Sequence, residues 1–230
     1  MSHYKIAVIV DGHDEYEVDD ILAPYSENLE VEPYIDMTRE EFIEYVQNIN
    51  KDFKDWEGLT HEERYQKYIE TYDIMVDEDG NKLTTYNPNS KWDWYSIYND
   101  ESFAEFKKRL FKPLTRAEIK RCRKVWDWLN SDQEDSDDED IIDYMFFKKE
   151  YYLDSYKDFE TFLRCEHFFA SDMPYALVDR NGWYALGNVG WFAVDDATAD
   201  SINDYINFIY NYVHTPSNKD KRVVWVDCHI

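Results

Sequence analysis

The chain has 230 residues, which is enough for one large domain or two small ones. A hydrophobic content of 43% and an aromatic content of 18% can fill a core and exclude a disordered acidic tail. The net charge of −25 repels phosphate backbones and anionic lipids, so we expect no direct nucleic-acid or membrane binding and a basic partner instead.

Cysteine usage and the first residues indicate the compartment. Three cysteines without a framework spacing argue against a disulfide-stapled secreted domain. The start of the chain lacks the basic and apolar regions of a signal peptide, and no apolar run is long enough to span a membrane. We therefore expect a cytoplasmic protein.

The first 36 residues predict a strand, a helix and a second strand. Lys5 to Val10 is a run of β-branched apolar residues typical of a buried strand, and Val18, Ile21 and Leu22 follow at helical spacing. Glu30 to Asp36 then predicts a strand in which Pro33 favours an edge or a bulge.

The middle of the chain, from about residue 37 to residue 166, is predicted to be mainly helical. Three pairs of residues have the spacing of a capping box and mark helix starts: Thr38 with Glu41, Thr60 with Glu63, and Thr115 with Glu118. Between the second and third starts, Asp79-Gly80 predicts a hairpin turn within Ile74 to Tyr86.

The last part of the chain returns to strands. We expect a hairpin over Tyr175 to Val194 with its turn at residues 179–182, a helix through Ile202 to Val213, and a strand at Val223 to Cys228. The order of elements predicts an α+β fold with a split-βαβ, ferredoxin-like antiparallel sheet. Residues 1–36 and 167–230 would form that sheet core, and residues 37–166 a mainly helical insertion with a small hairpin and an acidic loop.

Ser131 to Asp140 is the most acidic segment of the chain. Such a run is explained either by a solvated loop or by carboxylates that imitate a row of phosphates and fill a basic groove on a partner. The basic segment Lys107 to Lys124 favours an ion-paired support for this run over a nucleic-acid patch. Seven carboxylates are candidate partner-binding residues: Asp132, Glu134, Asp135, Asp137, Asp138, Glu139 and Asp140.

Trp92 and Trp94 lie in an aromatic segment with Asn and Asp, and we include them among the candidate partner contacts. Such a cluster suits either a stacking platform for a base or sugar, or a loop pinned over the core.

Catalytic and metal motifs are weak. Cys228 and His229 form a Cys/His pair near the end of the sequence, a poor place to preorganise a nucleophile. The same pair with Cys165 and His167 has poor zinc spacing, because neighbours on a strand point to opposite faces. We predict no catalytic residue, metal or cofactor.

Four stretches together resemble a family of uncharacterised phage and prophage proteins: residues 10–45, TYNPNSKWDWY at 85–95, NGWYALGNVGWFAV at 181–194, and VVWVDCHI at 223–230. In that family, the WDWY segment runs on into Gly-Gly-Arg-Trp, which is absent after Tyr95, and a His stands where this chain has Tyr184. The acidic run is not part of the pattern, so the resemblance implies a scaffold with a task of its own.

The resemblance and the charge together predict a phage-encoded inhibitor of a host defence system that acts in the host cytoplasm. It would be similar to an anti-CRISPR protein and would bind a basic, nucleic-acid-binding host protein, such as a CRISPR effector, by mimicking nucleic acid. Two alternatives stay open, namely an enzyme or degenerate enzyme acting on a nucleotide or nucleic acid, and an acidic phage accessory or structural protein.

Overall fold

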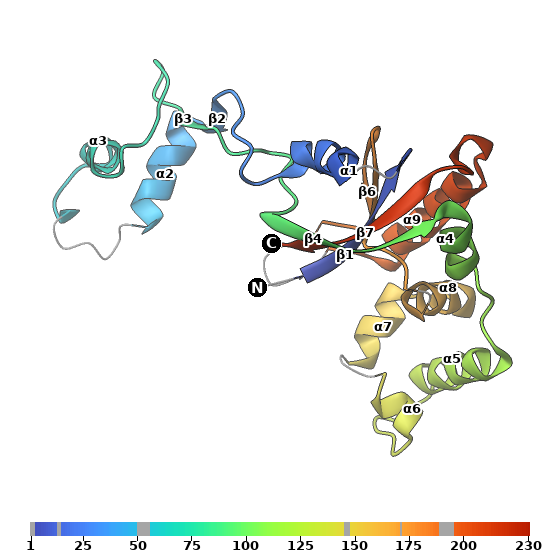
Figure 1. Cartoon of the computed structure of the whole chain (residues 1–230). Helices are drawn as coiled ribbons and strands as arrows, with labels where there is room; N and C mark the ends of the chain where they lie inside the picture. Colours follow the sequence, from blue (N-terminus) through green and yellow to red (C-terminus); the bar gives the residue numbers. More distant parts are fainter. Residues whose placement is uncertain (1–2, 13–14, 50–55, 145–147, 171, 189–195) are drawn as a thin grey trace. The chain divides into compact units, whose positions relative to one another are not determined.

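A computed structural model of the chain describes residues 3–12, 15–49, 56–144, 148–170, 172–188 and 196–230 (Figure 1). The chain folds into two compact units. One unit comprises residues 1–24 and 91–230, and the other comprises residues 25–90. This division differs from the expected boundaries at residues 36 and 167, because residues 91–166 belong with the two chain ends.

The first unit is built on a mixed five-stranded sheet with the order β4-β7-β1-β5-β6. Its strands are β1 (His3–Val10), β4 (Trp94–Ser102), β5 (Ala176–Asp179), β6 (Gly182–Ala185) and β7 (Arg222–His229). The first and last strands are antiparallel neighbours, from the pair His3 and His229 to the pair Val10 and Arg222. The α+β class and the joining of both chain ends in one sheet are therefore confirmed.

The strand order differs from the predicted split-βαβ arrangement in two ways. β1 and β5 are parallel, so the sheet is not purely antiparallel, and the segment predicted at Glu30 to Asp36 is not part of it. Ile35 in that segment is 52% exposed, as expected of a strand outside a central sheet. β4 occupies the edge beside β7 instead.

Helices cover both faces of the sheet. The helices of this part are α1 (Glu15–Leu22), α4 (Phe103–Leu110), α8 (Phe159–Ala170) and α9 (Ala199–His214), with short 3-10 turns η1 (Ala23–Tyr25) and η4 (Pro216–Asn218). Side chains from α4, α8 and α9 form one core with β1, β5 and β7, around Phe106, Leu177, Ile209 and Trp225. α1 contacts β1 and β5. β1 is buried from Ile6 to Val10, which explains its continuous apolar run.

The hairpin of β5 and β6 confirms the turn predicted at residues 179–182. The Asp179 carboxylate accepts hydrogen bonds from the backbone N–H groups of Asn181 (2.8 Å) and Gly182 (3.2 Å). β6 ends at Ala185. Residues 189–194, expected to complete the second strand, lie outside the described residues.

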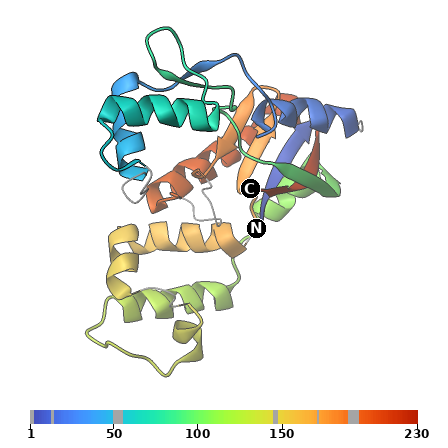
Figure 2. The same ribbon diagram turned by 90° about the vertical axis from the view of Figure 1, so that its left-hand side faces the viewer.

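A second set of helices lies between α4 and β5 in the chain. It consists of α5 (Arg116–Leu129), α6 (Glu139–Ile142), α7 (Lys149–Ser155) and α8, and we call these four elements the helical lobe. α5 and α8 lie side by side (Figure 2). The lobe has its own core around Val125, Leu129, Tyr152 and Phe162. α8 serves both cores, since Cys165 and Phe168 belong to the core beneath the sheet.

The second unit combines a small sheet with two helices. Its elements are β2 (Tyr34–Met37), α2 (Arg39–Ile49), α3 (His61–Tyr72) and β3 (Lys82–Thr84). β2 and β3 are antiparallel, with Tyr34 opposite Thr84. The predicted hairpin turn is confirmed by a bridge between Val76 and Lys82, with Gly80 at a φ of +84°, but the partner of β3 is β2.

The predicted helix starts agree with the structure. Capping boxes join Thr60 to Glu63 and Thr115 to Glu118 at the first turns of α3 and α5. Thr38 and Glu41 exchange the same hydrogen bonds at the start of α2, where the Thr38 N–H donates to Glu41 Oε2 at 2.9 Å. Among the helices that the structure describes, none is long and apolar enough to cross a membrane.

Candidate protein-binding surface

The acidic run forms the connection between α5 and α6, and we call residues 131–140 the acidic loop. Asp132, Glu134, Asp135, Asp137 and Glu139 are exposed, whereas Asp138 and Asp140 are half-buried. The loop ends where the Asp138 side chain accepts a hydrogen bond from the Asp140 N–H and caps α6. The seven carboxylates therefore divide into an exposed set and a structural pair.

The structural pair contacts basic side chains of α5. Lys124 Nζ lies 2.5 Å from Asp138 Oδ2 and 3.0 Å from Asp140 Oδ2, and Arg121 Nε lies 3.4 Å from Asp140. The hydrogen bond from Lys124 is the main reason that the pKa of Asp138 is lowered. These ion pairs confirm the prediction that the basic segment Lys107 to Lys124 supports the acidic run.

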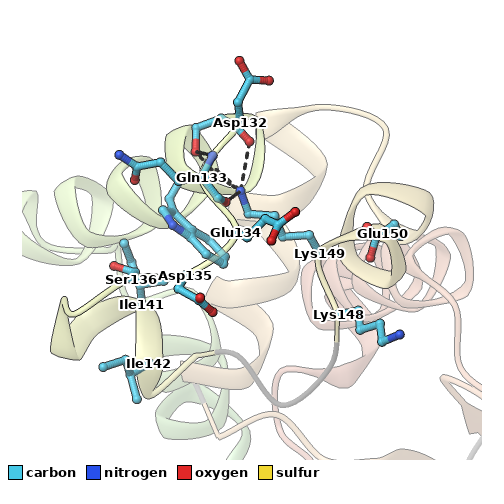
Figure 3. A pocket seen from close by; sticks show the side chains of 12 residues that line it. Asp132, Gln133, Glu134, Asp135, Ser136, Ile141, Ile142, Lys148, Lys149 and Glu150 are labelled. Atoms are coloured by element: carbon cyan, nitrogen blue, oxygen red, sulfur yellow. Dashed lines mark hydrogen bonds between the residues drawn. The ribbon is translucent and has the colours of Figure 1, made fainter.

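Lys149, at the start of α7, holds the other end of the acidic loop (Figure 3). Its Nζ donates to the backbone oxygens of Trp128 (2.7 Å), Ser131 (3.0 Å) and Gln133 (2.6 Å). The same ammonium lies 4.0 Å from the centre of the Trp128 ring. One ammonium group thus joins three backbone carbonyls at the start of the acidic loop.

The acidic loop, α6 and α7 line a pocket of about 760 Å³ that is open to solvent. Asp132, Glu134 and Asp135 line it together with the apolar side chains of Ile141 and Ile142. Among the described residues, no ion pair or hydrogen bond engages the side chains of Asp132, Glu134, Asp135, Asp137 or Glu139. These five acids form what we call the free acidic set.

Sequence reasoning missed the role of Lys149. A Lys-Lys-Glu stretch after an apolar segment is common, and nothing in it indicates that one ammonium reaches three carbonyls. Sequence reasoning also treated all seven carboxylates as equivalent. Only the fold shows that Lys124 occupies two of them.

Trp92 lies just before the edge strand β4 and Trp94 is its first residue, far in sequence from the acidic loop. The Trp92 indole N–H donates to the Leu22 backbone oxygen at 3.2 Å, and the centre of its ring lies 4.9 Å from that of Tyr95 in an edge-on contact. Trp94 is 44% exposed and stacks on the His229 ring at 5.0 Å. Trp92 is therefore pinned against the core, and Trp94 presents the more accessible ring.

The Cys228 and His229 side chains do not form a nucleophile and base. They are neighbours on β7 and point to opposite faces, and His229 Nδ1 bonds to Asp93 Oδ1 at 2.6 Å. Cys228 is fully buried, and that burial raises its pKa well above the usual range. A buried thiol of this kind is largely protonated near neutral pH and is a poor nucleophile.

We expect the double substitution Cys228→Ser with His229→Ala to leave partner binding largely intact in the folded fraction of the protein. Both side chains are buried, so some loss of thermal stability will accompany the substitutions. Binding is measured at matched concentrations of folded protein. Loss of binding at full thermal stability would instead place chemistry at this pair.

The possible zinc ligands are also separated. Cys165 is buried beneath the sheet, and His167 Nε2 bonds to the Lys112 backbone oxygen at 2.7 Å, while Cys228 belongs to β7. In the part of the chain that the structure describes, no group of three or more His, Cys, Asp or Glu side chains is placed to hold a metal ion.

Comparison of the chain with protein-family models, curated proteins and solved structures finds no match. The resemblance to phage and prophage proteins stays a prediction from the sequence.

Proposed function

We propose that the protein is a phage-encoded, anti-CRISPR-like inhibitor that binds a basic, nucleic-acid-binding host protein through the acidic loop. The free acidic set supplies the contact, and the partner's groove, built for phosphates, supplies the cations. Trp94 is an additional contact at a separate position. The setting in the host cytoplasm follows from the sequence resemblance and belongs to the same proposal.

The observation that carries the proposal is that some carboxylates of the acidic loop are ion-paired within the protein and others are exposed. Asp138 and Asp140 pair with Lys124, and Lys149 fixes the backbone, yet five exposed carboxylates in the same loop form no ion pair with any residue that the structure describes. A merely solvated loop does not need such supports. Fixing the backbone in advance reduces the entropy that must be lost when a partner binds.

The net charge makes electrostatics the main driving force. A field from −25 charges attracts a basic partner over long distances and raises the association rate, and added salt screens this attraction. It also disfavours contact with nucleic acid itself, which has the same sign of charge. An inhibitor that competes with nucleic acid is therefore a better match to the charge than an enzyme that binds it.

The test neutralises only the free acidic set, by replacing Asp132, Asp135 and Asp137 with Asn, and Glu134 and Glu139 with Gln. A stoichiometric basic partner isolated from host lysate with the wild-type protein provides the binding assay. We expect the variant to bind at least about tenfold more weakly, mainly through slower association, with a flatter dependence on salt.

The matched control removes five other exposed carboxylates that make no ion pair among the described residues. Its substitutions are Glu30→Gln, Glu32→Gln, Glu57→Gln, Glu70→Gln and Glu78→Gln, all in the second unit. Both variants change the net charge equally, so a difference in their affinities reports the position of the charges. We expect the control to retain most of the affinity, because its substitutions lie outside the acidic loop. Equal losses would show that only the overall charge matters, and wild-type affinity that is constant between ~50 and ~500 mM salt would refute the groove-filling proposal.

A further inference from the structure

A second, smaller pocket lies inside the helical lobe, between α5 and α8. Its volume is about 200 Å³, below the roughly 300–1,000 Å³ of sites for drug-sized ligands, so it suits a single side chain. Leu114, Val125 and Phe162 supply apolar walls. Cys122, Tyr144 and Glu166 bring polar atoms to the same space.

Glu166 is the distinctive group of this pocket. It is half-buried, and that burial raises the pKa of its carboxyl group. The Tyr144 hydroxyl donates to Glu166 Oε1 at 2.9 Å, whereas Oε2 accepts no hydrogen bond from any described residue. Among the described residues, no cation forms an ion pair with this carboxylate to offset the cost of its desolvation.

The two charged residues at the rim are already engaged. Arg121 Nε contacts Asp140, and Glu118 accepts the Thr115 N–H in the capping box of α5. The charge of Arg121 acts to lower the pKa of Glu166, against the larger effect of burial, but Arg121 makes no ion pair with it in the structure. The ion-pair partner of Arg121 is instead Asp140 of the acidic loop.

We propose that this pocket binds an alkylammonium group, and specifically a lysine side chain of the basic partner. The apolar walls fit the four-carbon stem, and Oε2 of Glu166 accepts from the ammonium. A guanidinium is a poorer match, because its two parallel N–H groups prefer both carboxylate oxygens and Tyr144 already occupies one. The identity of the macromolecule rests on the proposed function, but the alkylammonium specificity does not.

The first experiment titrates the whole protein with n-butylammonium chloride at about pH 8 and follows the methyl NMR signals of Leu114 and Val125. The methyl signals of Ile209, in the core beneath the sheet, serve as an internal reference. We expect saturable shifts only at the pocket, with binding at least about tenfold tighter than that of the neutral 1-butanol, because a charge-assisted bond is lost with the ammonium.

Glu166→Gln should abolish that preference, while the exposed Glu160→Gln on the same helix should retain it. Gln keeps an acceptor for Tyr144, so the fold is preserved, and an unchanged melting temperature confirms this. n-Butylguanidinium binding as tightly as n-butylammonium would redirect the assignment to arginine. Equal binding of n-butylammonium and 1-butanol, or an unaltered preference in Glu166→Gln, would overturn it.

The failures of the two proposals are distinguishable. Neutralising the free acidic set should leave n-butylammonium binding within about twofold of the wild-type value, because exposed charges contribute little to a local contact. In the partner assay, Glu166→Gln should weaken binding chiefly by faster dissociation, whereas the acidic-loop variant slows association. Unchanged dissociation from the partner would refute the lysine assignment even if the acidic loop proves essential.

Discussion

Phe162→Ala is expected to destabilise the protein by about 3–5 kcal/mol, as measured by chemical denaturation. Phe162 is fully buried at the centre of the helical lobe. Its ring contacts those of Trp126 (5.5 Å), Tyr144 (5.6 Å) and Tyr156 (5.3 Å), so the substitution leaves a cavity and removes several aromatic contacts.

The same substitution should also abolish partner binding, although every acidic residue is retained. The acidic loop depends on α5 and α7, which pack on the core that Phe162 fills. Leu153→Ala on α7 is the control, because Leu153 is 37% exposed and its loss should cost less than about 1 kcal/mol. Full affinity in Phe162→Ala would show that the loop binds as an unstructured acidic peptide.

Helix starts and the central strands could be predicted because their signals are local. A capping box needs only two residues three positions apart, and Thr60 with Glu63 and Thr115 with Glu118 form it as expected. The apolar run in β1 identifies a strand that is buried on both faces. Neither signal depends on what the rest of the chain does.

The partners of the strands could not be predicted, because pairing depends on residues far apart in the sequence. The sequence does not predict β4 as part of the sheet, because apolar and polar residues do not alternate regularly along it. Most of its residues are exposed, as is typical of an edge strand. A register shift between Ile97 and Asn99 further breaks its period of two. β2 carries β-branched and aromatic residues, but these pair with β3.

The binding surface, too, depends on contacts between residues far apart in the sequence. The sequence shows where negative charge gathers, but the geometry of the fold decides which carboxylates are used internally. Lys124 lies 16 positions before Asp140 and 14 before Asp138, yet it pairs with both because α5 and α6 pack together. No sequence pattern around Glu166 indicates a binding site, because its pocket is assembled from two helices and Tyr144.

Trp225→Ala should destabilise the protein by about 3–5 kcal/mol through the core beneath the sheet. Trp225 is 4% exposed on β7, and its indole N–H donates to Glu101 Oε1 at 2.7 Å. Glu101 also binds Arg109 at 2.7 Å, and the Arg109 guanidinium lies 4.6 Å from the Trp225 ring centre. The substitution therefore opens a cavity beside an ion pair that has lost its apolar cover.

Trp225→Phe separates the two contributions, because it keeps an aromatic ring but removes the hydrogen bond. We expect it to cost about 1–3 kcal/mol, clearly less than Trp225→Ala, by chemical denaturation. Below its unfolding transition, Trp225→Ala should bind the partner with nearly wild-type affinity, since Trp225 is not part of the helical-lobe core that carries the acidic loop. A parallel loss of binding in folded Trp225→Ala protein would mean that the sheet contributes more to the partner interface than the additional contact at the exposed ring of Trp94.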